Sequence, residues 1–174
     1  MAKDDSFFIR HTVRTNGTNF TQEAIDLGAF VDALGMSILK VHSVSVQYQA
    51  TANADLPIMP ATQSTSKITW QLTTQSQTKV VSLGDRTVFG SGHLTVGNSA
   101  SNSYAPTIVY ETADANAQTW RNGYAIAVDQ VYLGVDNSAS LLAATGECDV
   151  TVLLECTVEK LNKESALALA LSQQ

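Results

Sequence analysis

The sequence has little charge. Asp, Glu, Lys and Arg make up 15% of its 174 residues, against about 25% in an average soluble domain. The formal net charge at pH 7 is -6, and the cations near the N-terminus, Lys3, Arg10 and Arg14, form no basic arm. Because binding to phosphates needs clustered Lys and Arg, we expect no direct binding of nucleic acid. Low charge instead suits wide contacts with neighbouring protein molecules, since charge is depleted at the centre of interfaces.

Long hydrophobic runs are also missing. No stretch approaches about 18 consecutive apolar residues, so we expect no transmembrane segment. Met1–Asp5 is polar, and Phe7–Ile9 is too short for the hydrophobic region of a signal peptide. A chain of 174 residues is long enough for one domain with a substantial core.

Cysteine is scarce, with only Cys148 and Cys156. Both lie on the same face of one predicted strand, where their spacing corresponds to roughly 27 Å, whereas a disulfide needs Cα atoms within about 7 Å. We therefore expect two free, buried thiols that act as small core residues. Free thiols are consistent with synthesis and assembly in a reducing cytoplasm.

The sequence contains no recognisable catalytic or metal-binding motif. His11, His42 and His93 fall on different predicted strands, and none has metal-ligand spacing to another histidine or to a cysteine. No G-x-S-x-G elbow occurs. Gly90–Gly92 lacks the lysine and helix that follow in a phosphate-binding loop. We expect neither an enzyme nor a bound cofactor or metal.

What is present most clearly is one long strand, Cys148–Leu161. Its even positions from Cys148 to Val158 are apolar and its odd positions are mostly polar, a period of two that predicts one buried face and one solvent-exposed face. A strand of this length belongs to a large antiparallel sheet packed on a second layer.

Other segments predict further strands. Ser6–Thr15 alternates and ends at Asn16–Gly17, a common hairpin turn pair. Similar patterns occur at Asn19–Leu27, Ile68–Leu72, Lys79–Leu83, Thr87–Val96 and Thr107–Thr112. Polar loops are expected at Asn98–Pro106 and Ala113–Asn122.

Two segments change the parity of their apolar residues. In Ile38–Ala50 the change falls near His42–Ser43, which predicts a β-bulge. In Gly123–Asp136 it falls at Asp129–Gln130, and a second bulge is the simplest interpretation. We expect this second strand to form a hairpin with Cys148–Leu161 through the loop Asn137–Glu147.

These patterns predict an all-β fold, a two-sheet antiparallel sandwich or single jelly-roll barrel with about eight strands over residues 1–161. Residues 162–174 are rich in helix formers, and Asn162 is placed as an N-cap, so a short helical tail is expected. A helix this short is marginal alone, and its leucines spread around it. The tail therefore needs a partner surface, on its own domain or on a neighbour.

Four residues are candidates for contacts with other molecules. Leu167 and Leu171 lie on the tail, which we expect to contact a neighbouring molecule. Tyr104 and Trp120 each lie in a predicted loop and are candidate interface or ligand contacts.

The strand count, the long loops rich in Ser, Thr and Asn, and the lack of a catalytic motif together resemble the single jelly-roll capsid proteins of icosahedral viruses. The resemblance extends over Ser6–Leu161 and includes stretches such as Ala125–Asp136 (AIAVDQVYLGVD) and Cys148–Leu161. Within that group the chain is similar to the small major capsid proteins of tailless archaeal and bacterial viruses with an internal membrane.

This resemblance implies a barrel that stands on a shell, with sides, loops and termini contacting neighbouring capsomers. The partners it implies are copies of the chain itself and a second capsid protein, in a virion assembled in the host cytoplasm. Many capsid proteins have a basic N-terminal arm that this chain lacks. Its absence favours a shell that rests on a membrane or another protein layer over one that lines packaged nucleic acid.

Three functions are consistent with these features. The first is a structural, self-assembling shell subunit. The second is a carbohydrate- or receptor-binding β-sandwich, in which Tyr104 and Trp120 would form a sugar-stacking pair. The third is a tail-tube or sheath-like ring protein, which would also self-associate, but around a channel.

Overall fold

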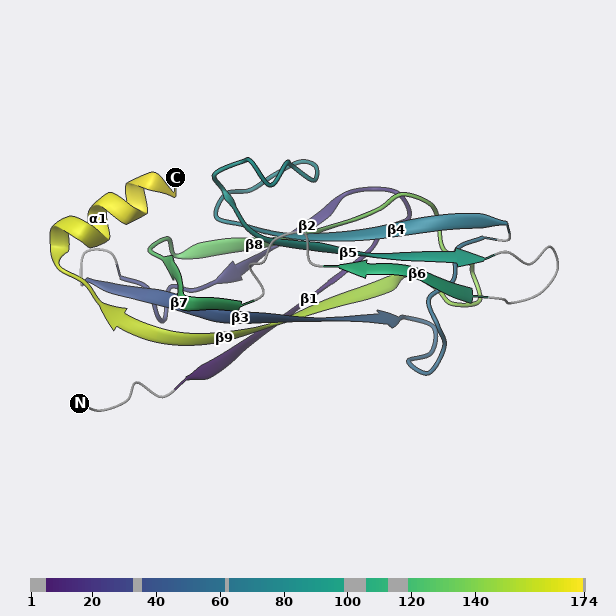
Figure 1. The fold of residues 1–174 in the computed structure, drawn as a ribbon, viewed down its shortest axis with the longest axis horizontal. Helices are drawn as coiled ribbons and strands as arrows, with labels where there is room; N and C mark the ends of the chain where they lie inside the picture. The colour runs from purple at the N-terminus through teal and green to yellow at the C-terminus, as the bar shows by residue number, and fades with distance from the viewer. Residues whose placement is uncertain (1–5, 33–35, 62, 99–105, 113–118, 174) are drawn as a thin grey trace.

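The computed structural model describes residues 6–32, 36–61, 63–98, 106–112 and 119–173, with the backbone alone at 106–112 and 119–121. The described residues form nine strands and one helix (Figure 1). These are β1 (Phe7–Arg14), β2 (Thr21–Asp26), β3 (Ser37–Ala50), β4 (Ser64–Thr73), β5 (Val88–Asn98), β6 (Pro106–Thr112), β7 (Thr119–Ile126), β8 (Gln130–Asn137), β9 (Cys148–Lys160) and α1 (Lys163–Ser172).

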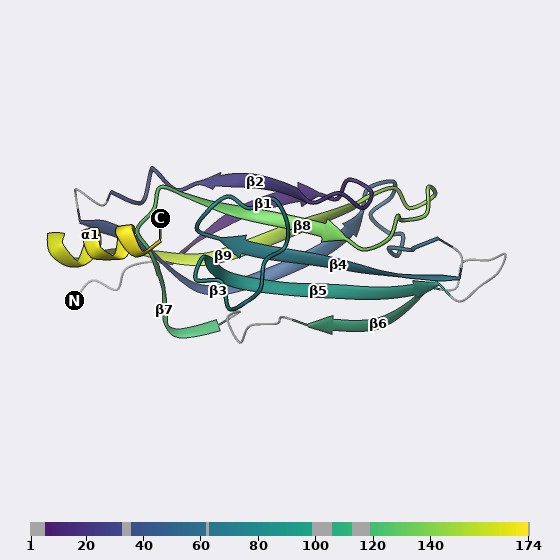
Figure 2. The same ribbon diagram turned by 90° about the horizontal axis from the view of Figure 1, so that it is seen from above.

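The strands form two antiparallel sheets that pack face to face (Figures 1 and 2). One has the order β1-β9-β3-β7 and the other the order β2-β8-β4-β5-β6. Strand β1 pairs with β9, β2 with β8, β3 with β7 and β4 with β5, while β6 is an edge strand beside β5. This is a long hairpin wrapped into two sheets, the jelly-roll topology. The predicted fold class is confirmed.

The predicted last strand is confirmed as β9, the centre of the first sheet. The side chains at even positions from Cys148 to Cys156 are fully buried, and those at odd positions are partly exposed. They face a core that includes Trp70 of β4 and Leu133 of β8, both also buried. Burial of large apolar side chains from both sheets holds the two layers together.

The bulge predicted in β3 is also confirmed. The register of β3 shifts between Val41 and Ser43 against both β7 and β9. Val41 before the shift and Val44 after it are both buried in the main core. The extra residue keeps apolar side chains facing inward along the whole strand.

The second parity change is not a bulge, and that prediction is wrong. The chain leaves the first sheet at Ile126 and enters the second at Gln130, so two strands of different sheets follow one another. Each sheet buries its own inner face, and the inward parity is therefore set anew at the crossing. The expected hairpin of this segment with Cys148–Leu161 is wrong for the same reason, because β8 and β9 lie in different sheets.

The strand predicted at Lys79–Leu83 does not form. This segment lies against the side of β4 opposite the core, where the Gln71 amide contacts Val81 twice. Gln71 Nε2 donates to the Val81 carbonyl at 2.8 Å, and the Val81 N–H donates to Gln71 Oε1 at 3.0 Å. The Gln71 side chain thus makes the two hydrogen bonds to Val81 that the backbone of a neighbouring strand would otherwise make. These bonds fix the segment beside β4 although it is not a strand.

The C-terminal helix predicted from Asn162 onward is confirmed as α1. The Ser165 N–H donates to Asn162 Oδ1 at 2.8 Å, which is the expected N-cap contact. The helix lies at the end of the sandwich where β9 finishes (Figures 1 and 2). No helix among the described residues has the length and apolar character needed to cross a membrane.

Candidate functional site

The titratable residues do not converge on one site. Within the described ranges, no group of three or more His, Cys, Asp and Glu side chains could hold a metal ion. On β1, His11 Nε2 lies 3.2 Å from Oε2 of Glu23 on β2. On β3, His42 Nε2 is hydrogen-bonded to Thr157 Oγ1 at 2.8 Å. His93 is buried in β5. The three histidines occupy three separate places in the fold.

The two cysteines are free and buried, as predicted. Burial disfavours the charged thiolate and raises the pKa of Cys148 to about 12. Burial raises the pKa of Cys156 to about 12 as well. Neither thiol is in the reactive thiolate form at neutral pH, which is unfavourable for a nucleophile.

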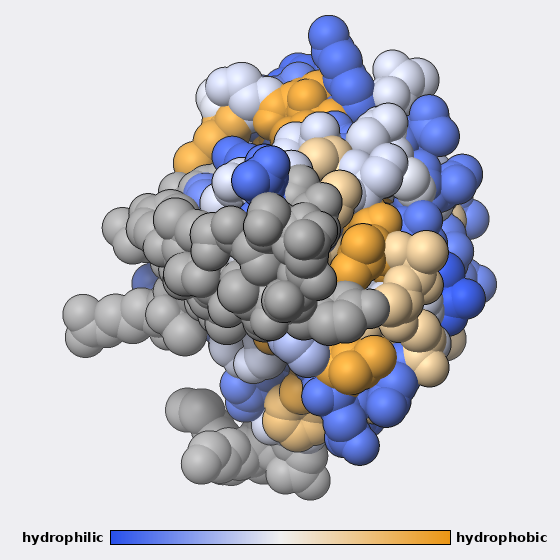
Figure 3. All heavy atoms as spheres, turned by 90° about the vertical axis from the view of Figure 1, so that its right-hand side faces the viewer, coloured by the Kyte–Doolittle hydropathy of each residue, from blue (hydrophilic) through white to orange (hydrophobic). Residues whose placement is uncertain are grey.

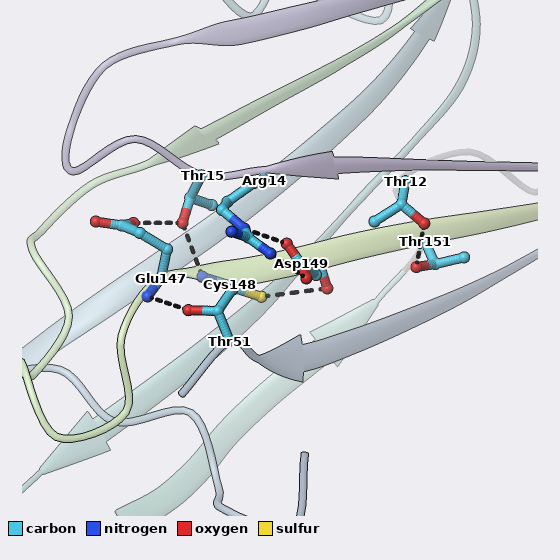
Figure 4. A network of polar contacts seen from close by, with 8 residues as sticks. All are labelled: Thr12, Arg14, Thr15, Thr51, Glu147, Cys148, Asp149 and Thr151. Carbon is cyan, nitrogen blue, oxygen red and sulfur yellow. Dashed lines mark hydrogen bonds and ion pairs between the residues drawn. The ribbon is translucent and has the colours of Figure 1, made fainter. Parts of the chain in front are cut away.

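Three connections meet at one end of the sandwich, which we call the loop end: β1–β2, β3–β4 and β8–β9. Glu147, just before β9, joins them (Figure 4). Its carboxylate accepts from Thr15 Oγ1 at 2.7 Å and from the Gly17 N–H at 3.2 Å. Its own N–H donates to Thr51 Oγ1 at 2.9 Å. One residue therefore links the turn after β1, the start of the β3–β4 loop and the end of the β8–β9 loop.

The hydroxyl of Thr15 extends this network to the first residue of β9. The Cys148 N–H donates to Thr15 Oγ1 at 2.9 Å, and the Thr15 N–H donates to the Cys148 carbonyl at 2.9 Å. On the outer face nearby, Arg14 forms two hydrogen bonds to Asp149, at 2.8 and 3.0 Å (Figure 4). The polar groups where β1 ends and β9 begins are thus matched to one another.

Further contacts join the β3–β4 and β8–β9 loops. Pro60 and Leu141 form an isolated β-bridge, and the Leu142 N–H donates to the Met59 carbonyl at 2.8 Å. Nearby, buried Ser66 donates to the side chain of buried Asn137. Seen end-on, the loop end shows hydrophobic groups and hydrophilic groups next to one another (Figure 3).

Sequence reasoning missed Glu147, Thr15 and Thr51. Each lies in or beside a loop, where no periodicity marks a side chain as important. The sequence feature that points to this place is the glycine at position 146, next to Glu147. In the structure Gly146 has φ of +67°, which favours glycine. A Cβ atom at this position would lie 2.4 Å from Thr51 Oγ1.

The opposite end, which we call the helix end, is apolar. Ala166 and Ala170 of α1 pack on Ile38 and Ala127 in a second, smaller core. The Gln173 side chain fastens the end of the helix: it accepts from the Ala127 N–H at 2.9 Å and donates to the Ala125 carbonyl at 2.8 Å. The tail therefore does have a partner surface on its own domain.

The candidate contacts Leu167 and Leu171 lie on the outer side of this helix. Their exposed fractions are 46% and 62%. In an amphipathic surface helix the large apolar residues face the core. Here the helix packs Ala166, Ala170 and the partly buried Leu169 against the domain and exposes these two leucines.

The two aromatic candidates are not brought together by the described residues. Tyr104 lies outside them. The expectation that Trp120 lies in a loop is wrong, because its backbone is in β7, beside β3 at the edge of the first sheet. The polar composition of Thr119–Asn122 concealed the beginning of a strand, which pairs with β3 among the described residues.

No protein family model matches the sequence, and no curated protein matches it significantly. Among solved structures, 19 chains match. One is from Desmodium yellow mottle tymovirus, with 12% sequence identity, a TM-score of 0.34, and coverage of 91% of this chain and 90% of that chain. A TM-score this low carries no functional argument, and the function has to be inferred from the surfaces of this chain.

Proposed function

We propose that the protein is a structural, self-assembling subunit of a viral capsid shell and carries out no catalysis. The observation that carries this proposal is the exposed leucine pair on the terminal helix of a jelly roll. Jelly rolls build viral capsids but also lectins and cupins, so the fold alone does not select the function. The orientation of α1 favours self-association.

The leucine pair indicates a contact that is weak by itself. Transfer of apolar surface out of water is favourable by about 25 cal/mol per Å². Two partly exposed leucines offer far less area than the roughly 800 Å² per partner of a standard stable interface. Such a contact becomes effective when a subunit makes several at once, as in a closed shell. Residues 162–174 would then contact a neighbouring copy while remaining packed on their own domain.

The rest of the surface is compatible with wide packing against copies. The outer side of the first sheet carries Ser45, Gln47 and Thr151, and two ion pairs lie there, Lys40 with Glu159 and Arg14 with Asp149. Burying hydroxyl and amide groups that find partners is less costly than burying unpaired charges. The shell would form in a virion, with a second capsid protein and an underlying membrane layer as further partners.

The test is the mass of the purified protein by light scattering across a concentration series, followed by negative-stain imaging of the heaviest fraction. Closed shells or regular pentamers and hexamers are expected. The double variant Leu167→Ser/Leu171→Ser should remain folded but shift to the monomer. Leu83→Ser is the matched control, since Leu83 is 47% exposed in the connection between β4 and β5, and should assemble like the parent protein.

Other outcomes would redirect the proposal. A strict monomer at every concentration, even with a co-expressed capsid partner, would contradict it. Quenching of tryptophan fluorescence by sugars would instead favour the carbohydrate-binding alternative. Assembly unchanged in the double variant would show that α1 is not the contact.

A further inference from the structure

The turn between β1 and β2 contains the dipeptide Asn16–Gly17. The Asn19 N–H donates to the Asn16 carbonyl at 3.0 Å and closes the turn, and Gly17 has φ of +57°. Asn16 is exposed, and no atom would lie within 4 Å of a Cβ at Gly17. Asn19 Nδ2 also donates to the Asn16 carbonyl at 3.2 Å.

An asparagine followed by glycine is chemically labile. The glycine nitrogen loses its proton and attacks Cγ of the asparagine side chain, and ammonia leaves as the five-membered succinimide forms. Water then opens the ring at either carbonyl and gives aspartate or isoaspartate. The reaction needs no reagent besides water, and glycine permits it because it has no side chain to hinder the approach.

We propose that Asn16 is a site of spontaneous deamidation and that Glu147 suppresses the reaction by holding the Gly17 N–H. The attacking atom, the Gly17 nitrogen, donates its proton to Glu147 Oε1 at 3.2 Å. The same carboxylate is fixed by the hydroxyl of Thr15 at 2.7 Å. This inference concerns the loop end and does not depend on the proposed capsid function.

Two effects of Glu147 act in the same direction. Loss of the Gly17 proton would place a negative nitrogen beside the Glu147 carboxylate, and like charges at this distance repel. The hydrogen bond also holds the turn in its closed form, with Asn16 bridged to Asn19. Attack therefore requires that the turn first separate from Glu147.

The product would not fit the turn. In isoaspartate the main chain runs through the former side-chain carbon, which lengthens it by one methylene. The carbon whose oxygen now accepts both bonds from Asn19 becomes a free carboxylate. A new negative charge then lies in the same turn as the Gly17 N–H that Glu147 holds. Formation of isoaspartate at Asn16 would thus detach the β1–β2 turn from the loop end.

The test is the rate of deamidation at Asn16, measured by mass spectrometry of peptides and by isoaspartate detection during incubation of the full-length protein. Glu147→Ala removes the acceptor for both Thr15 and Gly17 and should raise the rate about tenfold, the change expected for losing one hydrogen bond to a charged group. Glu147→Gln keeps one amide oxygen as an acceptor and should give an intermediate rate.

The chain supplies its own control in Asn122–Gly123, a second Asn-Gly pair, which lies in β7. If Glu147→Ala merely unfolds the protein, both pairs will deamidate faster; if Glu147 acts locally, only Asn16 will. An unchanged or slower rate at Asn16 in Glu147→Ala would overturn the proposal. So would parallel acceleration at both sites, or a parent protein that deamidates at Asn16 as fast as its urea-unfolded form.

Discussion

The two ends of the sandwich are held by different interactions. At the loop end, three connections are joined through hydrogen bonds that converge on Glu147 and Thr15. At the helix end, α1 packs on Ile38 and Ala127 and is fastened by one amide, that of Gln173. Hydrogen bonds are directional and are lost when the geometry changes. The loop end therefore depends on a directional network of several residues, whereas the helix end depends mainly on apolar packing.

Substitutions at the two ends should therefore affect different properties of the protein. The loop end presents polar groups that are mostly satisfied within the chain, and substitutions there should change folding stability. The helix end leaves Leu167 and Leu171 exposed, and substitutions on its outer side should change association with little effect on stability.

The largest effect is expected for Gly146→Ala at the loop end. The new Cβ would lie 2.4 Å from Thr51 Oγ1, which accepts the Glu147 N–H, and alanine would have to adopt φ of +67°. Steric strain and the left-handed backbone together should lower the free energy of unfolding by about 3 kcal/mol. Urea denaturation monitored by tryptophan fluorescence measures this change.

Gly17→Ala is the matched control for this prediction. Gly17 has a similar φ of +57°, but a Cβ added there would meet no atom within 4 Å. Only the backbone cost remains, about 1 kcal/mol. Equal losses in the two variants would mean that the contact with Thr51 is unimportant, and the loop end would be less tightly specified than its hydrogen bonds indicate.

Alkaline pH should destabilise the protein through the buried thiols. In the unfolded chain each thiol has its ordinary pKa of 9.0, and burial raises the pKa of Cys148 and of Cys156 to about 12 in the folded protein. Above pH 9 the unfolded state loses thiol protons that the folded state retains, so stability falls as pH rises from about 9 towards 12. At about pH 10 the loss should be about 1 kcal/mol per thiol.

The measurement is the urea midpoint at neutral and alkaline pH in the parent protein and in Cys148→Ala and Cys156→Ala. The two variants should lose similar parts of the parent's pH dependence, whatever their own stability at neutral pH, and the partly buried Tyr124, whose pKa burial also raises, accounts for part of what remains. Cys148 begins β9 at the loop end, and Cys156 lies further towards the helix end. If the pH dependence of the urea midpoint decreased in one of the two variants and was unchanged in the other, only one thiol would have a raised pKa in the folded protein.

A smaller effect is expected for Gln173→Ala at the helix end. Two hydrogen bonds to the backbone of Ala125 and Ala127 are lost, each contributing about 0.5 to 1.5 kcal/mol, so a loss of about 1 to 2 kcal/mol is expected. Amide hydrogen exchange should increase in α1 and at Ala127 but not at Thr15 or Cys148. Ser172→Ala, which removes only a bond within the helix, should leave exchange at Ala127 unchanged.

The sequence predicted what depends on local periodicity. Alternation of apolar residues located β9, and the parity shift in β3 revealed its bulge, because a buried face imposes a period of two. The same rule misled at Asp129–Gln130, since a shift in parity marks either an extra residue or a passage between sheets. Residue order alone does not distinguish these cases.

The candidate sites were less predictable. Leu167 and Leu171 followed from the composition of the tail, but which side of α1 faces the domain depends on its contact with Ile38 and Ala127, far away in sequence. Glu147 acquires its role only because β1 and β9 pair and bring Thr15 beside it. Pairing of the first strand with the last is a tertiary property that no local pattern contains.

The smallest effect is expected for Arg14→Ala on the outer face of the loop end. Arg14 and Asp149 form a bidentate pair, and this hydrogen bonding raises the pKa of Arg14. The guanidinium is nonetheless in water, where ion pairs contribute little and are screened by salt. The urea midpoint should therefore shift least of all the variants, and the remaining shift should vanish at high salt. A loss as large as that of Gly146→Ala would mean that the exposed ion pair, and not the network around Glu147, holds β1 to β9 at this end.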